Sequence, residues 1–305
     1  MPIAKANGID IAYEETGDRA GPPFLLIMGL GAQLTYWPEA LHAGLARQGF
    51  RVIRFDNRDM GLSTKFEDAP PVDVTEAYMK RLRGEEFSAP YRLGDMARDA
   101  IGLMDWLKID KAHIVGASMG GMIGQIIAAE YGPRVRSLTS IMSTSGDPSL
   151  PQGKPEAVAV LTATPPPPSD REANIVHGVK CLQAIGSQTL PTPEADLRAK
   201  VAFAFDRSNY FGGVPRQLVA VIAEGSRVER LQRIAAPTLV IHGTEDPLVP
   251  VEGGKDTAAH IRGAELMLVQ GMGHDFPAPL IGKIVTAIAA HCRAADAEAA
   301  RQFAL

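Results

Sequence analysis

The sequence predicts an α/β protein with a mostly parallel, twisted sheet that is flanked by helices and carries a mainly helical insertion. Short apolar runs alternate with segments of helical spacing over residues 24–144, and the alternation returns from residue 236 onward. Between these parts lies a stretch without that rhythm. Alternating strands and helices are typical of a parallel sheet that is buried on both faces.

The individual elements follow from local patterns. Residues 5–15 alternate around Asn7-Gly8, a dipeptide that favours a two-residue hairpin turn. Continuous apolar runs predict buried strands at 24–29, 52–55, 113–118, 137–144, 238–243 and 265–271. Helical spacing and end signals predict helices at 37–49, 95–109, 119–131, 194–207, 214–224 and 280–292. Asp95 is expected to be the N-cap or a first-turn acid of its helix.

The break in the rhythm defines the domain organisation. It contains TPPPPSD at 164–170, which is too rich in proline for a regular element. We therefore expect a helical cap of residues 147–230, inserted into an α/β core of residues 1–146 and 231–305. The cap contains few distinctive polar residues, and its apolar content favours a core of its own over an apolar acyl or alcohol pocket.

Composition and charge exclude several classes of protein. The 305 residues suffice for a sizeable core, and a net charge of -4 gives no sign of nucleic-acid binding. No signal peptide or membrane span is apparent, so we expect a soluble, cytoplasmic protein. The two cysteines, Cys181 and Cys292, are far apart and indicate neither a disulfide framework nor a zinc site. The sequence leaves a homo-oligomer open.

The stretch HIVGASMGG indicates a serine held for chemistry. A Gly-x-Ser-x-Gly pattern is weak alone, but here it lies where a buried strand ends and a helix begins. In so sharp a turn, glycine at 116 and 120 avoids clashes, and Ser118 would stand above the sheet. The following helix would direct its free N–H groups toward charge that develops beside this serine.

A serine nucleophile needs a base, and the base needs an orienting acid. Asp246 and His274 follow late strands, at the edge of an open α/β sheet where ligands bind. We expect them to be acid and base. Glu245 and Asp147 are the alternative acids, whereas Asp275 is expected to stay solvated. His113 and His242 are expected to be structural.

An acyl-transfer site also needs two N–H donors for the oxyanion. Met119, directly after the nucleophile, supplies the first. The loop IMGLGAQ at 27–33 is the natural source of the second, with Leu30 presenting its backbone N–H between two glycines.

The segments IMGLG, FDNRDMGLS, GASMGG, HGTEDPLVP and GMGHDFP, in this order, resemble the α/β-hydrolase fold superfamily over nearly the whole chain. Within it, the sequence is similar to the serine esterase branch that includes aclacinomycin methylesterase. The resemblance implies the same triad and the same two oxyanion donors. Two positions depart from the commonest pattern, with Met28 in place of His and Asp59 in place of Gly. Asp56 and Arg58 are expected to organise their loop as a buried ion pair.

These features predict a carboxylesterase that works through an acyl-enzyme, with a small-molecule ester as substrate and without a cofactor or metal. Carbon–carbon bond hydrolysis, perhydrolysis and amide hydrolysis would use the same triad. A serine at the turn argues against the haloalkane dehalogenase and epoxide hydrolase branches, whose nucleophile is a carboxylate. A ligand receptor of the same fold with slow turnover is the alternative from another class.

Overall fold

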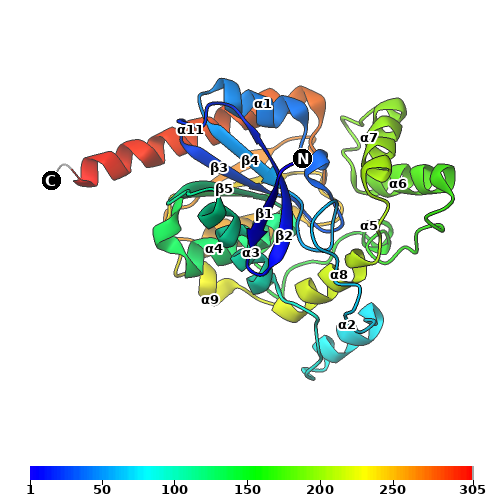
Figure 1. Cartoon of the computed structure of the whole chain (residues 1–305). Coiled ribbons are helices and arrows are strands. Elements are labelled where there is room, and N and C mark those ends of the chain that lie inside the picture. Colours follow the sequence, from blue (N-terminus) through cyan, green and yellow to red (C-terminus); the bar gives the residue numbers. More distant parts are fainter. Residues whose placement is uncertain (304–305) are drawn as a thin grey trace.

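An eight-stranded sheet forms the centre of the computed structural model, which describes residues 1–303 (Figure 1). Its strand order is β1-β2-β4-β3-β5-β6-β7-β8. The strands are β1 (Ile3–Ala6), β2 (Ile9–Thr16), β3 (Pro23–Ile27), β4 (Arg51–Phe55), β5 (Ala112–Ala117), β6 (Val135–Ile141), β7 (Thr238–Gly243) and β8 (Glu265–Val269). Only β1–β2 and β2–β4 pair in antiparallel fashion among these described strands. The predicted, mostly parallel sheet is confirmed.

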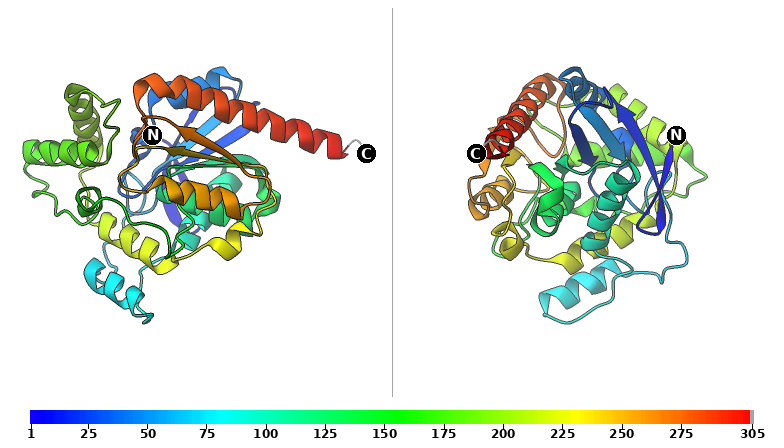
Figure 2. Two further views of the ribbon diagram at one scale, coloured as in Figure 1. Left: turned by 180° about the vertical axis from the view of Figure 1, so that it is seen from behind. Right: turned by 60° about the vertical axis from the view of Figure 1, so that its left-hand side comes forward.

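Helices cover both faces of this sheet (Figures 1 and 2). One face carries α1 (Glu39–Arg47) and α11 (Ala278–Phe303), and the other carries α3 (Leu93–Trp106), α4 (Met119–Glu130) and α10 (Val251–His260). In β3, Phe24 and Leu26 belong to the apolar cluster on the first face, whereas Leu25 and Ile27 belong to the cluster on the second. Burial on both sides is the reason why the strands read as continuous apolar runs.

The chain enters the sheet through the predicted hairpin. Asn7 and Gly8 both have positive φ angles, 49° and 79°, which a two-residue turn of the hairpin type requires. Ala6 pairs with Ile9 across this turn. The Asn-Gly dipeptide therefore sets the register of β1 on β2.

The segment between β6 and β7 is helical in the structure. It contains α5 (Pro155–Ala159), α6 (Arg171–Ile185), α7 (Glu194–Arg207), α8 (Gly213–Glu224) and α9 (Val228–Leu231). Figure 1 shows α6 and α7 standing to one side of the sheet, while α8 lies closer to the strands. Ile175 and Val179 of α6 pack with Leu197 and Val201 of α7, so these helices share a small apolar core. The exact limits of the cap, 147–230, stay a prediction.

Some elements differ from the sequence expectation. A short helix, α2 (Val74–Leu82), begins at the N-cap Asp73 and buries only Ala77, so it lacks the apolar stripe by which a helix is recognised. The C-terminal helix continues beyond residue 292 to Phe303 because its Ala-rich end favours helix even where it is little buried. Asp95 is a first-turn residue, and its carboxylate accepts a hydrogen bond from the N–H of Arg92. Single 3-10 turns occur at Leu34–Tyr36 and Gly132–Arg134.

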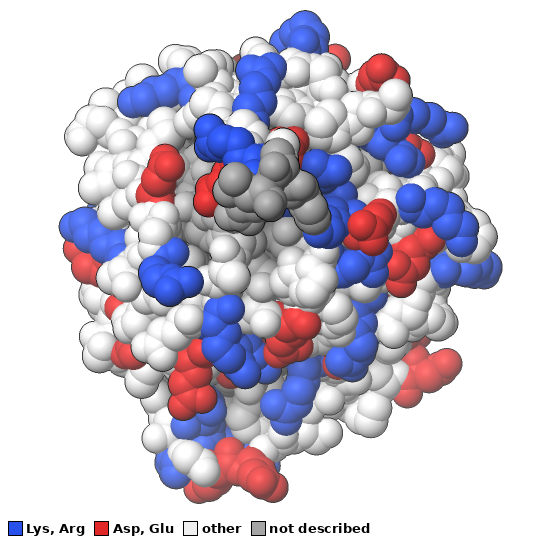
Figure 3. Space-filling view, turned by 90° about the vertical axis from the view of Figure 1, so that its left-hand side faces the viewer, with Lys and Arg blue, Asp and Glu red and all other residues white. Residues whose placement is uncertain are grey.

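The surface mixes charges of both signs. Figure 3 shows Lys and Arg side chains interspersed with Asp and Glu on the face that carries the end of α11. Within residues 1–303, none of the helices is both long enough and apolar enough to cross a membrane.

Candidate active site

Ser118 occupies a sharp turn between β5 and α4. Its φ and ψ angles are 55° and −122°, a conformation that costs free energy for a residue with a side chain. The turn leaves no room for side chains at the flanking glycines: a Cβ on Gly116 would lie 2.1 Å from the carbonyl oxygen of Gly120, and a Cβ on Gly120 would lie 2.0 Å from that of Ile27. The two glycines are thus required sterically, as the sequence predicts. The strained residue is the serine, whose side chain is partly exposed.

Asp246 and His274 are joined by a hydrogen bond at the same edge of the sheet. The bond runs from His274 Nδ1 to Asp246 Oδ2 over 2.8 Å. The other carboxylate oxygen accepts the backbone N–H groups of Leu248 and Val249, at 2.9 and 2.8 Å. Because a carboxylate can only accept, the imidazole proton lies on Nδ1 and the lone pair of Nε2 is free to take another proton.

The hydroxyl of Ser118 makes no hydrogen bond to His274 in the part of the chain that the structure describes. Catalytic hydrogen bonds are often long in a protein without substrate, and they tighten when the substrate is bound. The structure thus brings Asp246 and His274 into direct contact, and it places Ser118 directly after the end of β5.

The two amides expected to bind an oxyanion are unengaged within the described residues. Met119 is the first residue of α4, so its N–H has no acceptor within the helix. The N–H of Leu30 likewise makes no hydrogen bond to a described residue. The loop that contains Leu30 lies directly against the serine, since a Cβ on Gly29 would lie 3.1 Å from Ser118 Cβ.

Sequence reasoning gave no role to Asn57, which fixes the start of this loop. Its side-chain amide donates a 2.9 Å hydrogen bond to the carbonyl oxygen of Met28, and the residue is 2% exposed. The available signal was an asparagine in the FDNRDMGLS segment, two residues after the end of β4, the strand that pairs with β3.

The expected ion pair between Asp56 and Arg58 is wrong. Arg58 forms a bidentate salt bridge with Asp99 of α3, with N–O distances of 2.6 and 2.7 Å, and both residues are buried. The carboxylate of Asp56 instead accepts hydrogen bonds from the N–H of Leu34 at 2.8 Å and from the guanidinium of Arg207 at 2.7 Å. Both residues still organise loops, but each through a partner that is distant in the sequence.

Asp59 anchors the inserted helices to the sheet. Its φ is 68°, which explains why glycine is common at this position of the motif. Arg216 of α8 contacts both carboxylate oxygens at 2.9 Å, and the hydroxyl of Tyr91 donates to the same carboxylate at 2.7 Å. Burial opposes the charged form, but these bonds, and one from the N–H of Phe66, leave the pKa of Asp59 below its usual value. The inserted segment therefore contains distinctive polar residues, contrary to the sequence interpretation.

The alternative acids are engaged elsewhere. Glu245 accepts hydrogen bonds from the backbone and hydroxyl of Thr189. Asp147 accepts hydrogen bonds from the backbone N–H and the hydroxyl of Ser149. Of the carboxylates considered from the sequence, the structure brings only Asp246 onto the imidazole of His274.

The expectation that Asp275 stays solvated is wrong. Its carboxylate accepts hydrogen bonds from the N–H and hydroxyl of Ser187, and burial raises its pKa despite these bonds. Lys200 of α7 lies in the same region and donates a 3.1 Å hydrogen bond to the carbonyl oxygen of Tyr36. Burial lowers the pKa of Lys200 to about 8.

A second Ser–His–Asp arrangement lies inside the fold. His113 Nδ1 is 2.9 Å from Ser137 Oγ, and its Nε2 is 3.3 Å from Asp296 Oδ2. His113 and Ser137 are 0% exposed between two parallel strands and α11. A substrate cannot reach this serine without unfolding the packing around it. We refer to it as the buried chain and to Ser118, His274 and Asp246 as the edge chain.

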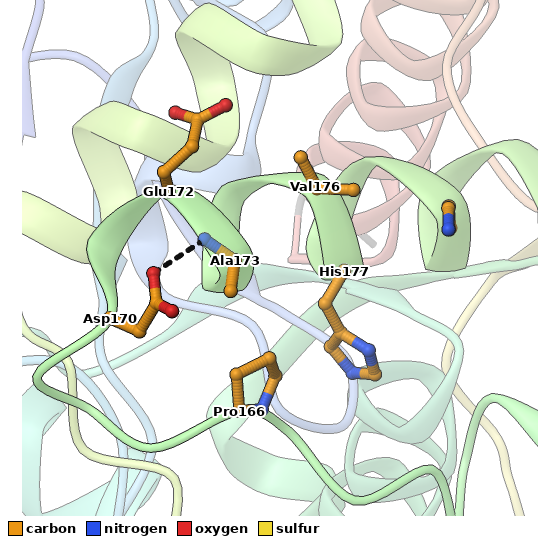
Figure 4. A pocket seen from close by; sticks show the side chains of 7 residues that line it. Pro166, Asp170, Glu172, Ala173, Val176 and His177 are labelled. Carbon is orange, nitrogen blue, oxygen red and sulfur yellow. Dashed lines mark hydrogen bonds between the residues drawn. The ribbon is translucent and has the colours of Figure 1, made fainter.

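One surface depression lies on the inserted helices. It has a volume of about 540 Å³ and is lined by residues of α6 and the preceding segment: Pro166, Asp170, Glu172, Ala173, Val176, His177 and Lys180 (Figure 4). None of these is a candidate site residue. Asp170 is the N-cap of α6, and its carboxylate accepts a 3.0 Å hydrogen bond from the N–H of Ala173. Within the described residues, no group of three His, Cys, Asp or Glu side chains is placed to hold a metal ion.

Comparisons with known proteins agree with this architecture. A family model described as alpha/beta hydrolase fold matches residues 22–164, and one described as TAP-like protein matches residues 220–283. The chain is 26% identical to Rhodomycin D methylesterase of Streptomyces peucetius, over 92% of this chain and 94% of that protein. It is 24% identical to the bifunctional esterase/perhydrolase of Acinetobacter calcoaceticus, over 90% and 93%. In structure it resembles the meta-cleavage product hydrolase from Pseudomonas fluorescens IP01, with a TM-score of 0.76 at 20% identity, covering 97% and 98% of the two chains.

Proposed function

Because the chain belongs to the α/β-hydrolase superfamily, we propose that it is a serine hydrolase that cleaves carboxylic esters through an acyl-enzyme intermediate. The observation that carries this proposal is the strained Ser118 at the strand-to-helix turn, at the sheet edge where Asp246 holds His274. Relatives over 90% and 92% of the chain are named as an esterase/perhydrolase and as a methylesterase. These names support ester hydrolysis as the class of reaction.

In the first half of the proposed reaction, Ser118 Oγ attacks the acyl carbon while Nε2 of His274 takes its proton. The carbonyl electron pair moves to oxygen, and the N–H groups of Leu30 and Met119 donate to the resulting oxyanion. Each such donor is worth about 3 kcal/mol in the transition state. The tetrahedral intermediate then collapses, and the alcohol leaves with the proton held by His274.

In the second half, water attacks the acyl group and gives its proton to the same imidazole. The acid is released and the proton returns to Ser118. Asp246 keeps the imidazole in the tautomer with its proton on Nδ1, and it stabilises the imidazolium that forms in each half. The site needs no metal ion or cofactor for these steps.

We further propose that the protein acts in the cytoplasm, since both cysteines are free thiols, which suits a reducing compartment. The substrate is proposed to be a small-molecule ester that enters between the inserted helices and the sheet edge.

The test is the release of nitrophenol from p-nitrophenyl esters, from acetate to decanoate, by the wild type, Ser118→Ala and Ser137→Ala at equal concentration. We expect many turnovers for the wild type and for Ser137→Ala, and none above background for Ser118→Ala. Ser137→Ala is the matched control because it removes a serine from the buried chain.

Two results would contradict the proposed ester hydrolysis through Ser118. The first is release of at most one equivalent by the wild type, as a slow receptor of the same fold would give. The second is turnover in Ser118→Ala that equals the wild type. Carbon–carbon bond hydrolysis and perhydrolysis would then be tested with a diketone and with peroxide as the acyl acceptor.

A further inference from the structure

Gln217 of helix α8 connects the inserted helices to the loop at 28–33. Its side-chain oxygen accepts the N–H of Gly31 at 2.9 Å, and its side-chain nitrogen donates to the carbonyl oxygen of Arg58 at 2.9 Å. The residue is 0% exposed. A buried amide with both ends bonded fixes the two groups that it connects, because breaking either bond leaves an unpaired polar atom.

Gly31 is the neighbour of Leu30, the proposed oxyanion donor. Gly31 has a φ of 68°, so the loop turns sharply at this residue. Val214, also on α8, packs against the turn, since a Cβ on Gly31 would lie 3.3 Å from its Cγ2. With the N–H of Gly31 held by Gln217 and that of Ala32 directed at the carbonyl oxygen of Gly29, the N–H of Leu30 is left for a substrate.

Helix α8 is itself held firmly in place. Arg216, which precedes Gln217, forms a bidentate salt bridge with Asp59. At the start of the helix, a Cβ on Gly213 would lie 2.3 Å from the carbonyl oxygen of Asp59, so the backbones touch there. Figure 1 shows the resulting position of α8, which lies beside α2 and apart from α6 and α7. Gln217 therefore stands on a rigid support.

We propose that Gln217 is a positioning residue that holds the Leu30 amide in the orientation required for an oxyanion, so that the oxyanion hole is completed by a side chain of the inserted segment. This role rests on the proposed ester hydrolysis. Gln217 acts through the loop and does not touch the substrate. The inserted helices thus contribute to the chemical step, in addition to enclosing the substrate.

The experiment compares Gln217→Met with Gln125→Met. Methionine keeps the length of the side chain but cannot form the two hydrogen bonds. Gln125 is the matched control because it is also 0% exposed and also makes two side-chain bonds, to Ser140 and from Arg227. For each variant, kcat and KM for the best p-nitrophenyl ester are measured, together with the inhibition constant of 1,1,1-trifluoro-2-octanone. In this inhibitor adduct, Ser118 Oγ bonds to the ketone carbon, its proton passes to His274, and the carbonyl oxygen becomes an oxyanion.

We expect Gln217→Met to lower kcat about 10-fold with KM within twofold of the wild type, and to raise the inhibition constant by the same factor. Gln125→Met is expected to keep both values. A loss of folded protein alone would lower apparent kcat and leave the inhibition constant unchanged, and that result would overturn the proposal. If Gln217→Met does not fold, Gln217→Asn, which is too short to span both partners, is expected to shift kcat and the inhibition constant in the same direction.

The outcomes separate the two proposals. An active wild type with an unchanged Gln217→Met overturns the role of Gln217 alone. A wild type that neither hydrolyses the esters nor binds the ketone overturns the proposed function, and with it the role of Gln217.

Discussion

The edge chain and the buried chain contain the same three residue types, but they differ in access and in the backbone amides beside their serines. In both, an aspartate lies within hydrogen-bonding distance of a histidine ring, at 2.8 Å in the edge chain and 3.3 Å in the buried chain. Ser137 sits within a strand with its hydroxyl beside His113 and 3.4 Å from the sulfur of Cys292. Ser118 sits at a strand end in a strained turn, at the N-terminus of a helix. The comparison teaches that access and oxyanion donors distinguish a catalytic triad, since hydrogen bonding alone does not.

The backbones around the two serines make the same point. The N–H groups near Ser137 belong to the ladder between β5 and β6, so they are already paired. The N–H of Met119 has no acceptor among residues 1–303, because the first N–H groups of a helix have no acceptor within the helix. A Ser–His–Asp chain in the middle of a sheet can therefore stabilise packing but cannot stabilise a developing negative charge.

The largest expected effect separates the two acids. Asp246→Asn should lower kcat/KM about 10⁴-fold, because the amide favours the wrong imidazole tautomer. Asp296→Asn should leave kcat/KM within twofold of the wild type and reduce only the free energy of unfolding, by about 1 to 3 kcal/mol. Steady-state kinetics and urea unfolding measure both. Equal losses of activity in Asp246→Asn and Asp296→Asn would contradict the assignment of catalysis to the edge chain alone.

The next prediction concerns access to the buried chain. The Cys292 thiol is 0% exposed, and burial raises its pKa to about 12. In Cys181→Ser, which leaves Cys292 as the single thiol, reaction with a disulfide reagent should be about 10³-fold slower in the native protein than in denaturant, since labelling needs an opening of about 4 kcal/mol. Rapid native labelling would show that the region around Ser137 is open to small molecules.

His42, which belongs to neither the edge chain nor the buried chain, provides a pH-dependent comparison. His42 is buried with no partner for its Nδ1 among the described residues, and burial lowers its pKa from 6.5 to about 4. The unfolded chain then binds a proton that the folded chain does not, so stability is full above pH 6.5 and falls as the pH drops toward 4. The loss attributable to His42 is at most about 3 kcal/mol.

Urea unfolding at pH 7 and pH 4.5 measures this loss. His42→Gln should show a smaller difference between the two pH values than the wild type. The remaining slope is expected from other buried groups, including His242 and His291, whose pKa values burial also lowers. An identical slope in the variant would mean that His42 titrates normally in the folded protein.

The smallest expected effect tests the space above the edge chain. A methyl group added by Gly29→Ala would lie 3.1 Å from Ser118 Cβ and 3.5 Å from its Oγ, so the loop or the serine must shift by a few tenths of an ångström. We expect kcat/KM to fall about 10-fold, since an error of 1 Å in position can cost about 100-fold. Gly282→Ala is the matched control, because nothing lies within 4 Å of its added methyl. An unchanged rate in Gly29→Ala would argue against close contact between loop and serine.

Local patterns were sufficient to predict much of the fold and the choice of candidate residues. The strands were found because both faces are buried, and the turn at Ser118 was found because glycines must flank it. Asp246 and His274 could be selected because carboxyl ends of parallel strands meet at one edge. Each of these inferences uses neighbours in sequence or the order of elements.

The partners that join distant segments could not be predicted in this way. Arg58 has two nearby aspartates in its own motif, but it bonds Asp99, 41 positions away. Gln217 meets Gly31 across 186 positions, and no local pattern marks a glutamine within an amphipathic helix. Such contacts depend on how the inserted helices dock, which is set by tertiary packing.

The most direct test of the central claim is to locate the nucleophile chemically. The wild type is treated with an alkyl fluorophosphonate, which transfers its phosphonyl group to an activated serine with loss of fluoride, and the labelled peptide is identified by mass spectrometry. We predict one phosphonyl group per chain, on Ser118 in the peptide around HIVGASMGG, and none in Asp246→Asn over the same time. A label on Ser137, or on another serine while Ser118 stays unmodified, would contradict the assignment of the edge chain.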